Sequence, residues 1–279
     1  MSKEIISEFE SSQLVYNHIK YADLTRNVIG PQTHDVFEIL YLKNGDLTYQ
    51  VEGKKYRVQK NAMIVTRPCF SHVLTLNSTK IYERYDFLFE NKVVAESVLK
   101  KLPDEMNLIN LNDCPEIADI FSRMDRYCAN FEGEELAKIL SNLVEEIFYN
   151  VIIISDKFPK NQLSGSYSAN PVISRAIDYI DAHLSEPFGI KKLCSELFVS
   201  RSYLHQLFMH HMQTSPQKYI STKRLLAAQK ELRSFKKPTE VYSLCGFADY
   251  SSFYRAYKKH FGYSPSEELD RESLRVIDF

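Results

Sequence analysis

IKKLCSELFVSRSYLHQLFMHHMQTSP (residues 190–216) and TEVYSLCGFADYSSFYRAYKKHFGYSP (residues 239–265) are two versions of one pattern, set 49 residues apart. Phe208-x-x-His211-x-x-x-Ser215-Pro216 in the first version returns as Tyr257-x-x-His260-x-x-x-Ser264-Pro265 in the second. Self-similarity at a fixed interval indicates one structural unit built twice. The C-terminal third of the chain therefore predicts a duplicated small helical unit.

The first version predicts a short helix over Ile190–Leu197, a turn, and a second helix that begins after the N-cap Ser200. Leu204, Leu207 and Phe208 recur at helical spacing and predict the buried face of this second helix. The side chains expected to point outward are Arg201, Ser202, His205, Gln206 and Met209, with Tyr203 near the edge. A helix-turn-helix places its second helix in the major groove, and the side chains expected to contact double-stranded DNA are Arg201, Ser202, Tyr203, His205 and Gln206.

The second version predicts a helix over Thr239–Leu244, a turn at Cys245-Gly246-Phe247, and a second helix capped by Asp249. Phe253, Ala256 and Tyr257 predict its buried face. The side chains expected to point outward are Tyr250, Ser251, Ser252, Arg255, Lys258 and Lys259. The guanidinium of an arginine can bond both acceptors of a guanine edge, whereas lysines suit phosphates.

A long helix is predicted between the two units, from Ser215-Pro216 to about Ser234. Near 20 residues at ~1.5 Å each span roughly 30 Å. That length is close to the ~34 Å rise of one DNA turn, so one chain could read two neighbouring segments of a duplex. A helical bundle that binds no ligand is the alternative.

Charge is distributed unequally along the chain. Residues 1–160 hold 19 Lys/Arg against 24 Asp/Glu, whereas residues 188–260 hold 13 against 4. A basic second half indicates an anionic partner, and nucleic acid is the first candidate.

The region from Ile190 to Pro265 resembles the DNA-binding region of the AraC/XylS family of bacterial transcription regulators. The strongest match is EVYSLCGFADYSSFYRAYKKHFGYSPSE (residues 240–267), and Leu193-Cys194, Arg224-Leu225 and Ala228 match in the first half. The chain departs from the family at Met209, where a lysine is usual, and further departures are Gln213, Pro238 and Glu268-Leu269. Loss of that lysine removes a phosphate contact from the first unit, whereas the fold is expected to be kept.

The N-terminal half has a different pattern. Short alternating runs broken by turn residues predict antiparallel strands in a small barrel or sandwich. The predicted strands are Val36–Leu42, Leu47–Val51, Tyr56–Val58, Ala62–Thr66 and Ile81–Phe89. Asn44-Gly45 is expected to form a tight hairpin turn, with a second turn at Glu52-Gly53-Lys54. Residues 1–20 are either a flexible arm or an edge strand.

The same half contains His34-x-x-x-Glu38-x₆-Gly45 and Pro68-x-x-x-His72, which resemble the two half-motifs of a cupin barrel. Regulators of this family often carry such a domain as an effector sensor, so the resemblance implies a small-molecule effector that is a sugar or a related polar metabolite. The expected effector-binding residues are His34, Glu38, Arg67, His72 and Tyr85. The alternative is a barrel that buries the polar groups of His34, Glu38 and His72 in hydrogen bonds of its own. Metal-binding cupins usually offer His-x-His, and Gln32 stands in the first of those positions, so no metal and no cofactor are expected.

Glu134–Ile154 predicts one helix whose apolar stripe is typical of a short coiled-coil seam. The stripe consists of Leu136, Leu140, Leu143, Ile147 and Ile154, with Asn150 at the remaining position. The stripe could form a homodimer seam or could pack on its own barrel, and both remain open. The Ser/Asn-rich residues 155–170 predict a linker.

These observations predict an α+β multidomain protein. Residues 1–154 form a cupin-like β-barrel with a helical dimerisation segment, and residues 171–279 form an all-α domain with two helix-turn-helix motifs. Five cysteines without a C-x-x-C pair, an acidic start and a longest apolar run of Val151–Ile154 indicate a cytoplasmic protein without a membrane span. A sequence-specific transcriptional regulator, not an enzyme, is expected; the alternative is a metal-dependent cupin enzyme with an appended helical domain.

Overall fold

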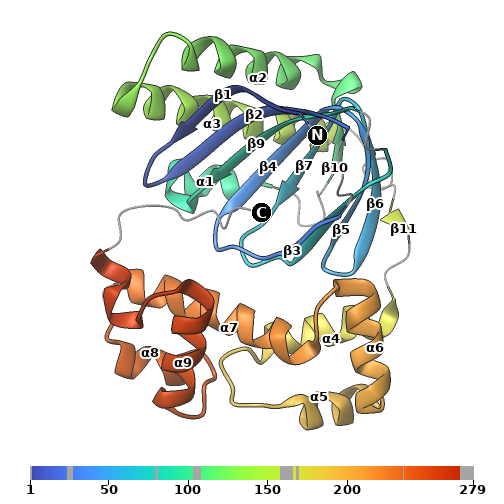
Figure 1. Ribbon diagram of the computed structural model, residues 1–279, viewed down its shortest axis with the longest axis vertical. Helices are drawn as coiled ribbons and strands as arrows, with labels where there is room; N and C mark the ends of the chain where they lie inside the picture. The colour runs from blue at the N-terminus through green and yellow to red at the C-terminus, as the bar shows by residue number, and fades with distance from the viewer. Residues whose placement is uncertain are drawn as a thin grey trace.

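The computed structural model describes residues 2–23, 28–78, 81–102, 108–157, 166–167, 170–234 and 236–270. The described chain has a β-rich N-terminal region and a helical C-terminal region (Figure 1). This division agrees with the change of pattern in the sequence. Among the described helices, none is both long and apolar enough to cross a membrane.

Two antiparallel sheets make up the β-rich region. The first has the strand order β1 (Ser2–Glu10), β2 (Leu14–Ala22), β9 (Ile81–Phe89), β4 (Phe37–Asn44), β7 (Ala62–Thr66) and β10 (Leu108–Asn110). The second has the order β11 (Ser166–Tyr167), β6 (Lys54–Gln59), β5 (Asp46–Val51), β8 (His72–Leu76) and β3 (Val28–Gln32). An apolar core that includes Leu40, Leu47 and Leu74 lies between them.

One predicted hairpin is correct and the other is wrong. Strands β5 and β6 pair across Glu52 and Gly53, both of which have positive φ, as a two-residue hairpin turn requires. Gly45 also has a positive φ, but β4 pairs with β7 and β9, whereas β5 pairs with β6 and β8. Asn44-Gly45 is therefore the corner at which the chain passes from one sheet to the other. Local turn chemistry predicted a change of direction there but could not identify the partner strands.

The N-terminal residues form strands. β1 is the edge of the six-stranded sheet and pairs with β2, which in turn pairs with β9. Of the two alternatives left open by the sequence, the described residues 2–10 adopt the edge strand.

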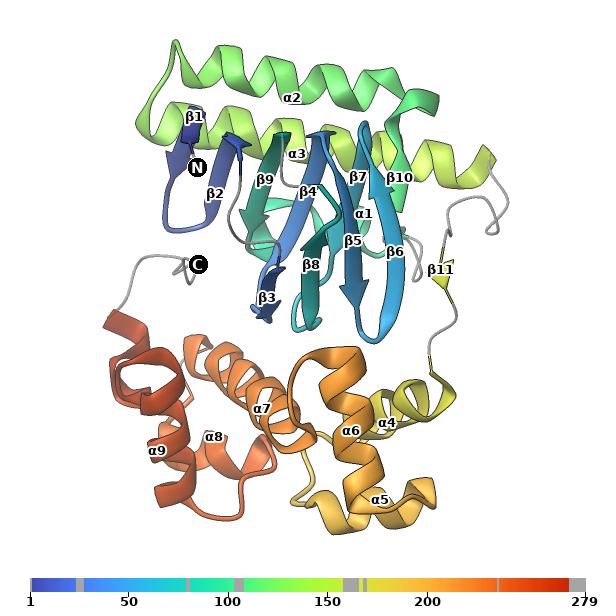
Figure 2. The ribbon, with the colours of Figure 1, turned by 45° about the vertical axis from the view of Figure 1, so that its right-hand side comes forward.

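After β9 the described part of the N-terminal region contains the helices α1 (Glu96–Leu99), α2 (Pro115–Cys128) and α3 (Gly133–Lys157), with β10 between α1 and α2 and short 3₁₀ turns at Asn91–Val93 and Leu111–Asp113. Helices α2 and α3 cover the outer face of the six-stranded sheet (Figures 1 and 2). The whole predicted apolar stripe of α3 is buried in this core: Leu136, Leu140, Leu143, Ile147 and Ile154. The stripe therefore packs inside the chain and is unavailable as a dimer seam in this arrangement.

The C-terminal region consists of α4 (Pro171–Ala182), α5 (Ile190–Leu197), α6 (Arg201–Met212), α7 (Pro216–Arg233), α8 (Pro238–Leu244) and α9 (Tyr250–Phe261), followed by a 3₁₀ turn at Pro265–Asp270. Asn170 caps α4 as predicted, since its side chain accepts from the backbone N–H of Val172 at 2.9 Å. α5 packs against α4 and α6, and α7 packs against α8 and α9.

The sheets lie between the α2–α3 pair and the C-terminal helices (Figures 1 and 2). In the predicted linker, α3 extends to Lys157, and β11 pairs with β6 through Ser166 and Tyr167; residues 158–165 and 168–169 lie outside the described residues.

Candidate functional site

Helix α6 presents one polar face to solvent. The hydroxyl of Ser200 accepts from the backbone N–H of Tyr203 at 3.2 Å and so begins the helix where the sequence predicted. Leu204, Leu207 and Phe208 are buried in the core with α4 and α5. The five residues of this helix predicted to contact DNA are all exposed: Arg201, Ser202, Tyr203, His205 and Gln206.

Helix α9 repeats this arrangement. A carboxylate oxygen of Asp249 accepts from the backbone N–H of Ser252 at 2.7 Å, and these hydrogen bonds lower the pKa of Asp249. Phe253 and Tyr257 are buried. Of the predicted outward residues, Ser251, Ser252, Arg255, Lys258 and Lys259 are exposed.

Tyr250 differs from its prediction. It is half-buried, and its ring lies 6.0 Å from that of Tyr242 and 6.1 Å from that of Phe253. Tyr250, the first residue after the cap, therefore faces back toward α8. Sequence periodicity did not reveal this orientation, because tyrosine is suited both to a surface and to the edge of a core.

Helix α7 connects the two capped helices. Its 18 residues correspond to about 27 Å of helix, slightly shorter than the predicted rod. In both views α6 and α9 lie at opposite ends of α7 (Figures 1 and 2). The buried Arg224 of α7 donates to the backbone oxygens of Leu184 and Glu186, so α7 is held firmly to the chain before α5.

A second cluster of polar side chains lies between the two sheets. Glu38 is on β4, His72 begins β8, and His34 precedes β4. Glu38 Oε2 lies 3.2 Å from His34 Nε2 and 3.0 Å from His72 Nε2. The structure thus brings together three of the five predicted effector-binding residues, which come from two separate half-motifs.

Burial alone would raise the pKa of Glu38, but the charge of His72 and the hydrogen bonds with both imidazoles hold it well below its ordinary value. Burial would lower the pKa of His34, but its hydrogen bond with Glu38 and the charge of Glu38 raise it. The cluster therefore favours an ionised carboxylate beside imidazole groups.

The other two predicted residues lie elsewhere. Successive side chains of a strand point to opposite faces of a sheet, and Tyr85 points to the face covered by α2. There its hydroxyl donates to Asp125 at 3.0 Å and its ring stacks on His18 at 3.7 Å. Arg67 donates to the backbone oxygen of Leu102 at 3.3 Å. Tyr85 is therefore wrongly assigned to the cluster, since the sequence did not fix which face of β9 looks inward.

Residues missed by the sequence line the same interior. Arg84 Nε lies 2.6 Å from Asp86 Oδ2, and both side chains project from β9 on the face that carries Glu38 in β4. Burial, with a contribution from Glu38, raises the pKa of Asp86 to about 7 against the opposing effect of Arg84. Tyr49 and Thr66 share a hydrogen bond nearby. The alternation Tyr82-x-Arg84-x-Asp86 was the signal that could have found this set.

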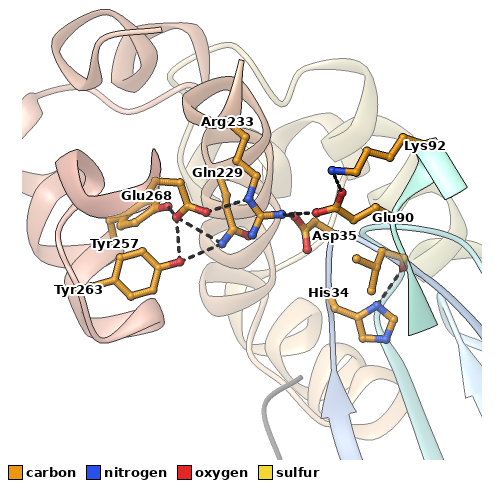
Figure 3. A network of polar contacts seen from close by, with 10 residues as sticks. His34, Asp35, Glu90, Lys92, Gln229, Arg233, Tyr257, Tyr263 and Glu268 are labelled. Carbon is orange, nitrogen blue, oxygen red and sulfur yellow. Dashed lines mark hydrogen bonds and ion pairs between the residues drawn. The ribbon is translucent and has the colours of Figure 1, made fainter. Parts of the chain in front are cut away.

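Helix α7 contacts the β-rich region near both of its ends. At its C-terminal end, Arg233 Nη1 lies 2.7 Å from Asp35 Oδ2, and Arg233 Nε lies 2.8 Å from Glu268 Oε1 (Figure 3). Toward its N-terminal end, the Tyr219 hydroxyl donates to Glu52 in the β5–β6 turn, and Lys223 Nζ lies 3.6 Å from the same carboxylate.

Comparison with known proteins gives a consistent result. Residues 193–271 match the family model described as "Helix-turn-helix domain". The chain is 23% identical over 246 residues to the HTH-type transcriptional activator RhaS of Escherichia fergusonii, covering 84% of this chain and 85% of RhaS. It is 30% identical over 129 residues to the raffinose operon transcriptional regulatory protein RafR of Pediococcus pentosaceus, covering 46% of each. A solved structure of ToxT from Vibrio cholerae aligns at 13% identity and a TM-score of 0.39, covering 92% of this chain and 98% of ToxT.

The two capped helices, their exposed polar faces and the matched model define a DNA-binding protein of the helix-turn-helix class. Residues 193–271 thus carry a helix-turn-helix domain, and over most of its length the chain is similar to a transcriptional activator, in agreement with the resemblance of its motifs to the AraC/XylS family.

Proposed function

We propose that this regulator reads two neighbouring segments of one DNA duplex with two helix-turn-helix units, α5–α6 and α8–α9. The observation that carries the proposal is the pair of capped helices with exposed polar faces at opposite ends of α7. The side chains proposed to reach the DNA are Arg201, Ser202, Tyr203, His205, Gln206, Ser251, Ser252, Arg255, Lys258 and Lys259. Tyr250, being half-buried, is proposed to support its neighbours.

The two sheets are proposed to form a cupin-like barrel within residues 1–154, with the DNA-binding domain over residues 171–279 and residues 155–170 as the connection. The effector site is proposed to be the interior polar cluster, with His34, Glu38 and His72 joined by Arg84 and Asp86. Buried carboxylates and a guanidinium can bond several hydroxyl groups at once, which suits a sugar or a similar polar metabolite. The relative RafR is named for a raffinose operon, which is compatible with this class.

Effector binding is proposed to act through α7. His34 and Asp35 are adjacent in the chain, and Asp35 pairs with Arg233. A ligand held by His34 would therefore lie beside one contact between the β-rich region and α7. The effector must bind one domain arrangement better than the other, because a ligand without differential affinity shifts no equilibrium.

The protein is proposed to work as a cytoplasmic homodimer, through the outward face of α3, since the inward stripe is buried. Tyr149 and Ile153 are large exposed hydrophobic residues on that face. In sedimentation experiments Ile153→Asp should shift a dimer toward monomer, whereas an unchanged dimer would place the interface elsewhere.

The test of function is selection of bound sequences from random duplexes by the full-length protein, repeated across a panel of sugars. Binding should select a site with two half-sites on one face of the duplex and should weaken steeply with salt, since phosphate contacts release counterions. A sugar that changes the affinity would identify the effector class. Absence of salt-dependent affinity for any duplex would overturn the proposal.

The second candidate function is a metal-dependent enzyme, favoured by the meeting of His34, Glu38 and His72. A regulator that acts by binding is preferred, because the two exposed helix faces have no role in such an enzyme. Turnover of a sugar or related metabolite by metal-loaded protein would reverse that preference.

A further inference from the structure

We infer that His34 Nε2, His72 Nε2 and Glu38 Oε2 form a binding site for one divalent transition-metal ion, with Zn²⁺ the best match. The three side chains offer ligand atoms that lie within 4.8 Å of one another. Two imidazoles and one carboxylate are a set that proteins use for Zn²⁺ and for non-haem Fe²⁺. The inference does not depend on the identity of the effector.

The ring orientation of both histidines directs their Nε2 lone pairs at the cluster. His34 Nδ1 lies 3.0 Å from the backbone oxygen of Val36, and His72 Nδ1 lies 3.2 Å from that of Phe70. A carbonyl oxygen only accepts, so both Nδ1 atoms must carry the proton. In neutral imidazoles the Nε2 atoms then present lone pairs toward Glu38, which is itself an acceptor when ionised. Either protons on Nε2 or a metal ion must therefore lie between these three electron-rich atoms.

When a histidine binds a metal through Nε2, its Nδ1–H usually donates to a backbone carbonyl or a carboxylate, which fixes the tautomer and the orientation of the ring. Both histidines have such a partner, although they come from different strands. The alternative cation is a proton on each imidazole, which would place two imidazoliums against one carboxylate in the interior. A single metal ion satisfies the same three atoms without two buried like charges.

The distances suit an ion. Ligand atoms ~2.0–2.1 Å from a tetrahedral Zn²⁺ lie roughly 3.3 Å from one another. The two measured separations from Glu38 Oε2 are 3.2 and 3.0 Å, so small side-chain rotations would complete the geometry. A hydrogen-bonded cluster without a metal would also have such distances, and the experiment must therefore detect the metal itself.

Three protein ligands leave a coordination position open. His72 and Glu38 are buried, whereas the His34 side chain is 19% exposed. Gln32 stands where metal-binding cupins usually have a histidine, which is why the sequence predicted no metal. Three protein ligands remain, and three is the number typical of zinc sites that also bind water or another molecule. A polar ligand of the sensor domain could take that position.

The test uses full-length protein stripped with a chelator and titrated with Co²⁺ and then Zn²⁺. We expect one Co²⁺ per chain, with visible absorption bands that Zn²⁺ abolishes. X-ray absorption of the wild-type Zn²⁺ form should show only nitrogen and oxygen ligands at about 2.0–2.1 Å. Sulfur ligands at about 2.3 Å would instead assign the metal to cysteines and overturn the site.

Glu38→Gln and His72→Gln should each weaken metal binding. Loss of a residue that only hydrogen-bonds to a metal ligand costs ~10–100-fold in affinity, and loss of a ligand itself should cost more. His183→Gln is the matched control, because it removes another histidine paired with a glutamate, at 3.0 Å on the surface, and should leave binding unchanged. Undiminished stoichiometric binding in both cluster variants, or no binding by wild-type protein, would overturn the inference. DNA binding is measured on the same metal-free protein, so that loss of the metal site and failure of the proposed function give separate results.

Discussion

Arg233 at the end of α7 reaches across the domain boundary to Asp35, with 2.7 Å between Nη1 and Oδ2, although 198 positions separate them in the chain. The same guanidinium holds Glu268, which in turn accepts from Tyr257 of α9 (Figure 3). A single arginine thus joins the segment beside the proposed effector site to the core around α9.

Asp35→Asn should loosen the domain contact, because it removes the charge that pairs with Arg233 while keeping the size of the side chain. The cost to domain docking should be about 1–3 kcal/mol for a partly buried pair. Hydrogen exchange of the backbone around residues 34–36 and 230–233 should accelerate, and the effect of effector on DNA affinity should shrink. Asp113→Asn, at an exposed position of the same domain, is the control. Unchanged exchange and an unchanged effector response would remove Arg233–Asp35 from the mechanism.

Arg255→Ala and Lys258→Ala should affect DNA binding in different ways. Both residues are exposed on α9. If Arg255 reads a base edge, its loss should cost about 1–3 kcal/mol of binding and relax preference at one position of the site. If Lys258 contacts phosphate, its loss should weaken binding to all sequences alike and reduce the salt slope by about 1. Competition titrations with single-base variants at several salt concentrations distinguish the two, and equal behaviour of both variants would contradict the assignment.

Phe198→Gly should make the DNA-binding domain more stable than Phe198→Ala. Phe198 ends α5 with a φ of 57° and is 90% exposed, so its ring gains little from burial. The left-handed conformation costs roughly 1–2 kcal/mol for residues other than glycine. Glycine loses more conformational entropy on folding than alanine, which offsets part of this gain. In urea denaturation the free energy of unfolding of Phe198→Gly should therefore exceed that of Phe198→Ala by about 1 kcal/mol. Equal stability of the two variants would mean that the backbone conformation stores no strain.

Asp125→Asn should destabilise the β-rich domain by about 2 kcal/mol at pH 7, since this carboxylate accepts hydrogen bonds from Tyr16 and Tyr85 and pairs with His18 at 2.8 Å. Burial would raise the pKa of Asp125, but its hydrogen bonds with His18, Ser7 and Tyr16 lower it below its ordinary 3.8. A carboxyl whose pKa is lowered on folding stabilises above its unfolded pKa and loses that effect as the pH falls. The difference between wild type and variant should therefore begin to shrink below about pH 4 and should be lost as the pH falls through the lowered pKa of the folded state.

Urea denaturation at a series of pH values checks this dependence. Asp119→Asn on the same helix removes a carboxylate that is 69% exposed and should change stability little. A variant as unstable at pH 3 as at pH 7 would show that Asp125 acts by packing instead of charge.

Local patterns allowed the sequence to predict the helices of the DNA-binding region closely. The caps Asn170, Ser200 and Asp249 lie where they were predicted, because a capping side chain and the apolar face it begins are only a few residues apart. The strands Ala62–Thr66 and Ile81–Phe89 were also predicted to the residue. Such features depend on neighbours along the chain.

The candidate effector site was only half predictable. The cupin half-motifs named His34, Glu38 and His72 correctly as neighbours, but Tyr85 was assigned to them and Arg84 and Asp86 were missed. A shift of one residue along a strand exchanges its two faces, and hydrophobicity did not distinguish them because both faces of β9 are buried.

By itself, then, the sequence determined a duplicated pair of capped helices with exposed basic and polar faces, and hence a DNA-binding regulator, because helix periodicity and capping are local. Only the tertiary structure decided that the α3 stripe is buried in its own domain, that β4 and β5 belong to different sheets, and that Asp35 and Glu52 hold α7. Those relationships join residues far apart in the chain, and they depend on which surfaces meet when the whole molecule buries its apolar area.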